Sequence, residues 1–267
     1  MELKNSNILI TGGSSGIGLE FVKQLSQLGA SIIVTGRSQE KLNQLKAQFP
    51  KAAIIKNDVG NPVDIEALSK QVIQQFPQLN IIINNAGIMR DVDLLNPKYD
   101  YESIADEIEI NLSGTIRMVH QFLPHLKTKR SAAIINVSSG LAFVPFPISP
   151  VYSASKAGVH AYTKVLRLQL KNTNVKVFEV APPGTDTPLQ NEFDSIADGS
   201  QQYMKADKMV GIAIQGILND RFEIRPGMAN TLKIMSRIAP NFILNQINNS
   251  LEKAKAKSKK MSLQYER

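Results

Sequence analysis

Short runs of β-branched and other apolar residues recur along this chain, and each is followed by a longer segment with helical spacing. The runs are NILIT, SIIVT, AAIIK, NIIIN, AAIINVS and VKVFEV. Nearly continuous apolar runs are typical of strands buried on both faces, and parallel strands need crossover connections that are usually helices. The pattern predicts an α/β fold, a single Rossmann-type doubly wound parallel sheet flanked by helices.

The segments between these runs carry apolar residues at helical spacing. Residues 16–28 are followed by Gly29, a typical helix stop. Residues 62–76 open with Pro62, which suits the first turn of a helix. We therefore expect helices over both ranges.

Composition and charge exclude several classes of protein. The chain has no cysteine, which excludes disulfides, thiolate zinc sites and cysteine nucleophiles and suits the cytoplasm. No apolar stretch approaches the ~20 residues of a membrane-spanning helix, so we expect no stable membrane insertion. Of the net charge of +8, half comes from residues 248–267, where six lysines and arginines face two glutamates without interleaved aromatics. This distribution favours a solvated tail over a nucleic-acid surface.

The sequence TGGSSGIG, residues 11–18, lies between the first predicted strand and the first predicted helix. Glycines there permit a tight turn and let a phosphate approach the backbone, while the helix N-terminus offers free N–H groups. The spacing differs from the common G-x-G-x-x-G fingerprint, and a turn that binds nothing is the alternative.

The end of the second predicted strand bears on which dinucleotide would bind. Gly36 takes the place where an acidic residue would hold a ribose 2′-hydroxyl, and Arg37, which can accommodate a 2′-phosphate, follows. We therefore expect NADP(H) in preference to NAD(H). The alternative is that Arg37 belongs to a solvated helix start.

Tyr152 and Lys156 lie one helical turn apart, after Ser149, which can cap a helix, and Pro150, which fits a first turn. The ordinary pKa of tyrosine is ~10, so acid–base work near neutrality requires lowering it by roughly three units, which a nearby ammonium promotes. The same spacing recurs by chance in helices, where the tyrosine is a half-buried packing residue.

Several motifs, taken together and in order, resemble one family. They are TGGSSGIG, NNAG at 84–87, INLSG, NVSS, YSASK at 152–156 and TDTP. This set resembles the short-chain dehydrogenase/reductase family, and the T-G-x-x-x-G-x-G spacing resembles its compact branch. Within the family, the run SSGLAFVPFPISPVYSASKAG is most similar to bacterial oxidoreductases called DltE.

The resemblance implies four catalytic residues. Tyr152 would be the general acid that protonates a carbonyl oxygen as hydride arrives at carbon, and Lys156 would lower its pKa and hold the nicotinamide ribose. Ser139 would hydrogen-bond the substrate oxygen, and Asn111 would bind a water of a proton relay. These roles match what the reaction needs: a proton donor, an oxyanion partner and a path to solvent.

The resemblance also implies a set of cofactor contacts, for which plainer alternatives exist. Asp58 could instead cap the next helix, and NNAG could be a structural strand exit. Pro183 stands where the family usually has glycine, which puts the local contacts of the nicotinamide in doubt. The implied cofactor-binding residues are Gly12, Ser14, Ser15, Gly16, Ile17, Gly18, Arg37, Asp58, Val59, Asn85, Ala86, Gly87, Tyr152, Lys156 and Thr187.

With these motifs in place, we expect a single dinucleotide-binding and catalytic domain over residues 1–247, because no linker divides the chain. Residues 188–207 are polar and are expected to form a substrate lid. A basic, flexible tail would follow at 248–267. Homodimers or homotetramers are what the resemblance implies.

The loop between Ser139 and Tyr152 is rich in apolar residues, which indicates a pocket wall for a lipophilic ketone or aldehyde, or packing onto this or a neighbouring subunit. Two apolar-faced segments split by Pro240 are expected to close a pocket or an oligomer interface, with membrane-surface contact as a lesser alternative. The three histidines, His120, His125 and His160, lack metal-ligand spacing and are expected on helix surfaces.

The sequence thus predicts an NADP(H)-dependent oxidoreductase that transfers hydride between nicotinamide and a small-molecule carbonyl or alcohol, of the carbonyl reductase or alcohol dehydrogenase type, with no metal. The alternative is a non-catalytic dinucleotide-binding protein, a redox sensor or scaffold that kept the fold.

Overall fold

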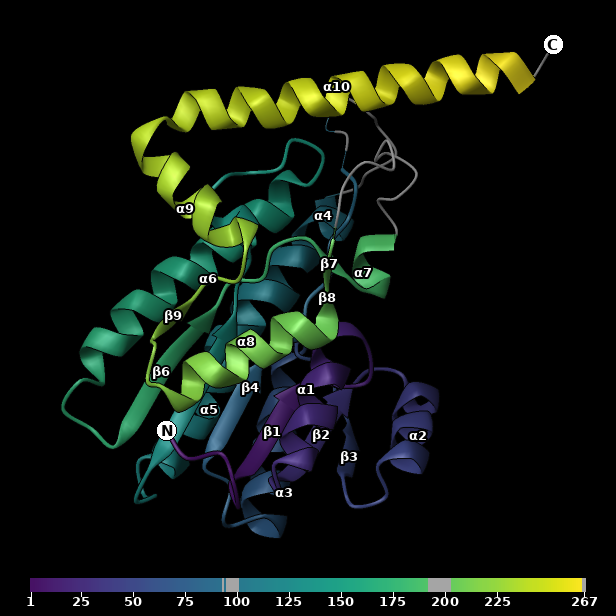
Figure 1. Cartoon of the computed structure of the whole chain (residues 1–267). Coiled ribbons are helices and arrows are strands. Elements are labelled where there is room, and N and C mark those ends of the chain that lie inside the picture. Colours follow the sequence, from purple (N-terminus) through teal and green to yellow (C-terminus); the bar gives the residue numbers. More distant parts are fainter. Residues whose placement is uncertain (93, 95–100, 192–202, 266–267) are drawn as a thin grey trace.

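A parallel sheet of seven strands forms the centre of the molecule (Figure 1). The computed structural model describes residues 1–92, 94, 101–191 and 203–265, and the backbone alone at 101–103, 191, 255 and 257–265. The strand order is β3-β2-β1-β4-β5-β6-β9, which confirms the predicted doubly wound α/β fold. The strands are β1 Asn7–Thr11, β2 Ser31–Gly36, β3 Ala53–Lys56, β4 Ile81–Asn84, β5 Ala132–Val137, β6 Val175–Val180 and β9 Glu223–Ile224.

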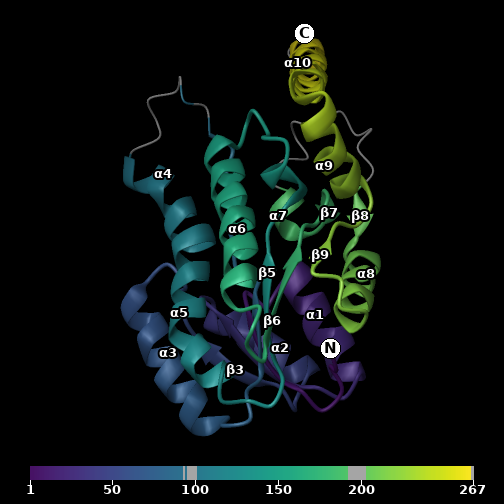
Figure 2. The ribbon, with the colours of Figure 1, turned by 90° about the vertical axis from the view of Figure 1, so that its left-hand side faces the viewer.

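Helices cover both faces of this sheet (Figure 2). Apolar side chains of α1, α2 and α8 bury one face, and those of α3, α5 and α6 bury the other. In β1, Ile8 and Ile10 face the first group of helices and Leu9 faces the second. Side chains alternate along a strand, so a sheet covered on both faces needs apolar residues at every position. The helices are α1 Gly16–Gln27, α2 Gln39–Gln48, α3 Pro62–Gln75, α4 Tyr101–Ile108, α5 Gly114–Leu126, α6 Pro150–Gln169 and α8 Ala206–Leu218.

The helix ends follow local sequence signals. Leu28 is the C-cap of α1, and Gly29 follows with a φ of 87°, a left-handed conformation that favours glycine. At α3, Pro62 occupies the first turn, and the Asn61 side chain accepts a hydrogen bond from Val63 N at 2.9 Å. These ends confirm the predicted helix boundaries to within one residue.

The C-terminal part of the chain differs most from expectation. After the short α7 (Pro188–Asn191) and the strand pair β7 (Thr185–Asp186) and β8 (Met204–Lys205), two further helices close the fold: α9 Met228–Ile238 and α10 Pro240–Tyr265. Residues 248–265, expected as a flexible tail, are the second part of α10, which lies across one end of the molecule (Figure 1). Alanine, lysine and leucine, which recur here, all favour helix. Among the described helices, none is long and apolar enough to span a membrane.

Candidate active site

A pocket of about 1650 Å³ opens at the carboxyl ends of the strands. Its floor lies where β1 and β4 are neighbours, the point at which the strand order reverses. In open α/β sheets this crevice is the usual ligand site, because the loops that leave the two strands diverge there. Most residues that the sequence singled out line it; Gly18 and Asn111 lie behind its wall.

The glycine turn after β1 packs directly on the turn after β4. Gly12 has a φ of 63°, and a Cβ there would lie 2.9 Å from the Cα of Ala86. The Asn85 side chain donates to Thr11 O at 3.0 Å and to Gly12 O at 3.2 Å, while Thr11 Oγ1 accepts from the backbone N–H groups of Asn85 and Ala86. Asn85 therefore clamps the two turns together, and it also lines the pocket.

The N-terminus of α1 leaves hydrogen-bond donors open toward the pocket. The first N–H groups of a helix have no partner within it, and they attract phosphate. Ser15 is the N-cap residue, and in the described chain its side chain makes no capping hydrogen bond. Gly16 brings this turn against Thr187, because a Cβ at Gly16 would lie 3.3 Å from the Thr187 Cβ. The arrangement fits the pyrophosphate of a dinucleotide.

Cationic side chains line the pocket beyond β2. Arg37 and Lys41 lie on its wall, and Ser38 caps α2 by accepting from Lys41 N at 3.2 Å. Gly36 packs closely on Ser14, with 3.2 Å between its Cβ position and Ser14 Oγ. This end of the pocket therefore carries positive charge, and position 36, at the end of β2, is a glycine and not an acidic residue.

Asp58 and Val59 also line the pocket, after β3. The alternative that Asp58 caps α3 is wrong, because Asn61 is the capping residue. Asp58 Oδ1 instead accepts from Gly60 N at 2.9 Å within its own loop.

Tyr152 and Lys156 lie on α6 and face the pocket with Ser139. The Ser139 side chain acts to lower the pKa of the Tyr152 phenol. Lys156 Nζ donates to Val137 O at 3.0 Å and lies 5.7 Å from the centre of the Tyr152 ring. The structure thus brings together a phenol, a hydroxyl and an ammonium at the end of β5.

The start of α6 is held differently from what the sequence suggested. Pro150 occupies the first turn as expected, but Ser149, expected to cap the helix, makes no capping hydrogen bond in the described chain. The Ser149 hydroxyl is fully buried and donates to Arg90 O at 2.9 Å. Residue 149 therefore ties α6 to the loop after β4.

Asn111 holds the wall of the site from behind. It lies in a π-helical turn, η1 (Glu109–Ser113), a geometry frequent at functional sites. Its side-chain N–H groups donate to Ile88 O at 2.9 Å and Ser155 Oγ at 3.0 Å, and its Oδ1 accepts from Ile88 N at 2.9 Å. The amide thereby joins the loop after β4 to α6.

Comparison with known proteins agrees with this geometry. The family model for short chain dehydrogenases matches residues 6–197. The chain belongs to the short-chain dehydrogenase family. It is 35% identical over 248 residues to the uncharacterized oxidoreductase DltE of Bacillus subtilis (strain 168), covering 93% of this chain and 98% of that protein. The predicted family and its DltE-like subgroup are confirmed.

Solved structures show the same fold. A short chain dehydrogenase from Burkholderia cenocepacia J2315 in complex with NADP has a TM-score of 0.79 at 24% identity, over 92% of this chain and 99% of that one. A short chain dehydrogenase/reductase from Burkholderia phymatum in complex with NAD has a TM-score of 0.76 at 20% identity, over 87% and 93%.

In this short-chain dehydrogenase, burial sets the protonation of the central pair. Burial raises the pKa of Tyr152 to about 12, with the Ser139 hydrogen bond opposing the shift and the charge of Glu107 adding to it. Burial lowers the pKa of Lys156 to about 8. The phenol is therefore a protonated donor at neutral pH.

Glu107 is a neighbour of the site that sequence reasoning missed. This fully buried carboxylate on α4 accepts a hydrogen bond from Arg90 N at 2.7 Å. Burial raises its pKa. In the sequence, Glu107 could be linked to the site only by its position one helical turn before Asn111. That spacing places the two residues on the same face of a helix.

The far end of the pocket is mostly apolar, with Thr231, Gln246 and Ser250 also in its lining. Leu141 and Phe146 line it from the loop after Ser139, and α9 and α10 contribute the facing wall. Ile238, the last residue of α9, is 73% exposed and does not line the pocket. The predicted lid, 188–207, lies in part outside the described residues, at 192–202. The wall residues from α9 and α10 include Leu232, Met235, Ile243, Ile247 and Leu251.

Two histidines depart from the expected surface positions. His120 is exposed on α5. His125 is half-buried, with its Nε2 3.1 Å from Leu79 O, and burial lowers its pKa. The His160 side chain is only 13% exposed and contacts Glu179. Both side chains have polar partners, Glu179 on β6 for His160 and Leu79 O just before β4 for His125. Polar groups can be buried in a helix face when such partners are available.

Proposed function

We propose that this short-chain dehydrogenase is an NADP(H)-dependent carbonyl reductase or alcohol dehydrogenase in which Tyr152 exchanges a proton with the substrate oxygen. The observation that carries the proposal is the convergence of Ser139, Tyr152 and Lys156 on the pocket that the glycine turn also lines. When bound, the nicotinamide would supply or accept the hydride.

The residues divide the remaining work. Ser139 and Tyr152 would hold the carbonyl oxygen by two hydrogen bonds, and Tyr152 would give its phenolic proton to that oxygen as the carbon gains hydride. Lys156 would stabilise the phenolate left behind and bind the ribose hydroxyls, because a nearby cation lowers the pKa of a phenol. In the reverse direction the phenolate would accept the proton of the alcohol.

Charge supports NADP(H) over NAD(H). Arg37 and Lys41 line the pocket beside Gly36, and a 2′-phosphate offers them a doubly charged partner. The N-terminus of α1 would bind the pyrophosphate. Asp58 would accept from the adenine amino group.

The apolar end of the pocket supports a lipophilic ketone or aldehyde as substrate. Leu141 and Phe146 face the walls from α9 and α10, so a hydrocarbon chain bound there would be removed from contact with water. We further propose a cytoplasmic enzyme that acts as a homodimer or homotetramer. Val165 and Leu168 on α6, 54% and 68% exposed, offer an apolar face for a second copy.

Cofactor binding tests the proposal before any substrate is known. The protein has no tryptophan, so NADPH and NADH fluorescence can be titrated with little interference. NADPH should bind more tightly, and Arg37→Ala should weaken NADPH binding by about tenfold or more while leaving NADH unchanged, because a charge-assisted hydrogen bond contributes about 1.5–3 kcal/mol. Arg130→Ala, an exposed arginine outside the pocket, is the control.

The outcomes separate the candidates. Equal binding of both cofactors, with no effect of Arg37→Ala, would contradict the NADP(H) preference. Binding of neither would direct attention to Pro183, which lines the pocket where the family usually has glycine, and would favour a scaffold over an enzyme.

A further inference from the structure

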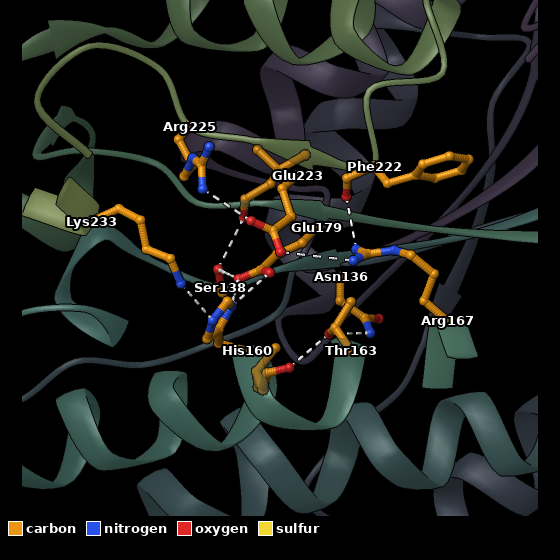
Figure 3. Close-up of polar contacts among 12 residues, drawn as sticks. Asn136, Ser138, His160, Thr163, Arg167, Glu179, Phe222, Glu223, Arg225 and Lys233 are labelled. Atoms are coloured by element: carbon orange, nitrogen blue, oxygen red, sulfur yellow. Dashed lines mark hydrogen bonds and ion pairs between the residues drawn. The ribbon is translucent and has the colours of Figure 1, made fainter. Parts of the chain in front are cut away.

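A connected group of polar side chains lies beside the pocket, apart from the proposed catalytic residues (Figure 3). Glu179 on β6 is 1% exposed and accepts a hydrogen bond from Ser138 Oγ at 2.5 Å. His160 Nδ1 lies 2.9 and 2.8 Å from the two carboxylate oxygens of Glu179. The other ring nitrogen, Nε2, lies 2.9 Å from Lys233 Nζ. A chain of hydrogen bonds therefore runs from α9 to the residue that follows β5.

The protons of this chain can be placed by chemistry. Burial alone would raise the pKa of Glu179, but hydrogen bonds from His160 and Ser138 outweigh it and hold the pKa below its usual range. The carboxylate is thus an acceptor, and Nδ1 of His160 carries a proton. One proton lies between Nζ and Nε2, and it belongs to Lys233 because an ammonium has an ordinary pKa of ~10.4 against ~6.5 for imidazole. Burial lowers the pKa of Lys233, and the charge of Glu223 opposes that shift.

With the ammonium on Lys233, the Nδ1–H of His160 donates to Glu179, and Nε2 accepts from Lys233. A second proton on the ring would place an N–H against that ammonium, so the contact between His160 and Lys233 would become repulsive.

The chain joins separate parts of the pocket. His160 lies on α6, one turn after Lys156, and Ser138 directly precedes Ser139. Lys233 lies on α9 next to Leu232, which lines the pocket wall. The elements that carry the catalytic residues and the apolar wall are thus tied through one histidine.

An aromatic contact strengthens the tie. Phe143 belongs to the loop between Ser139 and Tyr152. Its ring meets the His160 ring edge-on, with 5.0 Å between centroids, and Lys233 Nζ lies 4.4 Å from the centre of the Phe143 ring. A cation at that distance is attracted by the face of the ring.

We propose that Lys233, His160 and Glu179 are positioning residues that lock α9, a wall of the substrate end of the pocket, onto the catalytic helix α6, and that protonation of His160 opens this lock. The link to the reaction rests on the proposed function; the lock itself does not. Opening would move the apolar wall away from a bound substrate and leave the cofactor end in place.

The other charges around the lock do not provide an alternative switch. Glu223 on β9 binds Arg225 at 3.0 Å and Arg167 at 3.8 Å. Glu223 favours the charged form of Lys233, while Arg237 and Lys164 oppose it. Histidine is the residue type in this cluster that changes charge between about pH 5 and 8. Glu179 remains the partner that holds the ring in place.

Hydrogen exchange of the full-length protein tests the lock without any substrate. We expect the amides of α9 to lose protection by about tenfold between about pH 8 and pH 5.5, after correction for intrinsic exchange. Lys233→Met should show the low protection at both pH values, and Lys233→Arg, which can still donate to Nε2, should restore the pH dependence. His120→Gln, at an exposed histidine on α5, should behave as the wild type.

Two exchange results would overturn the lock. The first is equal protection of α9 at both pH values in the wild type. The second is a Lys233→Met variant whose α9 protection matches the wild type at about pH 8.

Kinetics with NADPH and decanal, a lipophilic aldehyde, test the link to the reaction. Lys233→Met should raise KM by about fivefold and keep kcat within about threefold at pH 8, and this difference should vanish at pH 5.5. A fall in kcat at unchanged KM would contradict a role in holding the substrate wall. Failure of the wild type to reduce decanal while binding NADPH would count against the proposed function, and hydrogen exchange would still decide the lock.

Discussion

Tyr152 and Lys156 are shifted by burial in opposite directions, and each shift favours the neutral form. The pKa of the phenol is raised to about 12 and that of the ammonium is lowered to about 8. Neutral groups are favoured in a buried site with little water. Proton transfer from Tyr152, however, produces a phenolate, and the site must stabilise that charge. The proposed mechanism therefore depends on Lys156 keeping its charge close to Tyr152 when the site is filled.

Replacing Tyr152 by phenylalanine should remove the proton donor and leave the pocket shape. We expect turnover of decanal with NADPH to fall by about 10²–10⁴-fold, the usual contribution of general acid–base catalysis, with NADPH affinity within about twofold. Tyr162→Phe is the matched control, because Tyr162 lies on the same helix, burial also raises its pKa to about 12, and it does not line the pocket. Turnover that survives in Tyr152→Phe would remove this phenol from the mechanism.

The buried Lys156 should make the stability of the cofactor-free protein depend on pH. Because burial lowers its pKa from 10.5 to about 8, the unfolded chain binds more protons between these values, and the free energy of unfolding should rise as pH increases through that window. At about 1.4 kcal/mol per pKa unit, the full effect is about 3 kcal/mol. Urea denaturation at about pH 7 and 9.5 should show about 2 kcal/mol of this rise in the wild type and in Lys164→Met, an exposed lysine of α6, but a smaller one in Lys156→Met. An equal rise in all three proteins would contradict the shift.

At the scale of elements, hydrophobic periodicity predicted the strands and helices whose own sequence determines their structure. The six predicted strands and the helices at 16–28 and 62–76 exist because each buries its own apolar pattern. β9 could not be predicted in this way, since its two residues form a strand by pairing with Glu179 and Val180 of β6. α10 continues through a lysine-rich segment because lysine and alanine favour helix, although the charge of this segment indicates a solvated tail.

The same distinction applies to the candidate site: parts within one motif could be predicted from the sequence, and contacts between distant segments could not. The glycine turn and the Tyr152–Lys156 pair lie within single motifs, where spacing alone places the side chains. Glu107 and His160 gained their roles from packing against elements distant in sequence, which no local pattern records. Partners of this kind become visible only when the fold brings α4, α6 and β6 together.

Two helix N-termini of this chain provide a matched test of what a capping position does. Asn61 caps α3 with its side chain, so Asn61→Ala should lower the free energy of unfolding by about 1 kcal/mol without changing NADPH affinity. Ser15 makes no such bond at α1 in the described chain, so Ser15→Ala should cost less stability but weaken NADPH binding. Urea denaturation and fluorescence titration of both variants check this. The reverse pattern would mean that the α1 terminus is structural.

At the scale of the whole molecule, the pocket lies between two parts of the fold. The sheet and its helices provide the cofactor end, with its glycine turn and cations. The last two helices, α9 and α10, lie over the carboxyl ends of the strands and provide the apolar wall (Figures 1 and 2). Binding of cofactor and of a lipophilic substrate should therefore respond to different parts of the chain.

A pair of substitutions on α10 tests this separation. Ile247 lines the pocket, whereas Leu244, on the same helix, is 37% exposed and does not. Ile247→Asp places a charge on the apolar wall and should weaken binding of the neutral fluorescent probe N-phenyl-1-naphthylamine by about tenfold or more, since burying an unpaired carboxylate is costly. NADPH affinity should stay within about twofold, and Leu244→Asp should change neither. If Ile247→Asp weakens NADPH as strongly as the apolar probe, the two ends of the pocket act as one unit. If both variants weaken the probe equally, the wall of the substrate site is not the face of α10 that Ile247 occupies.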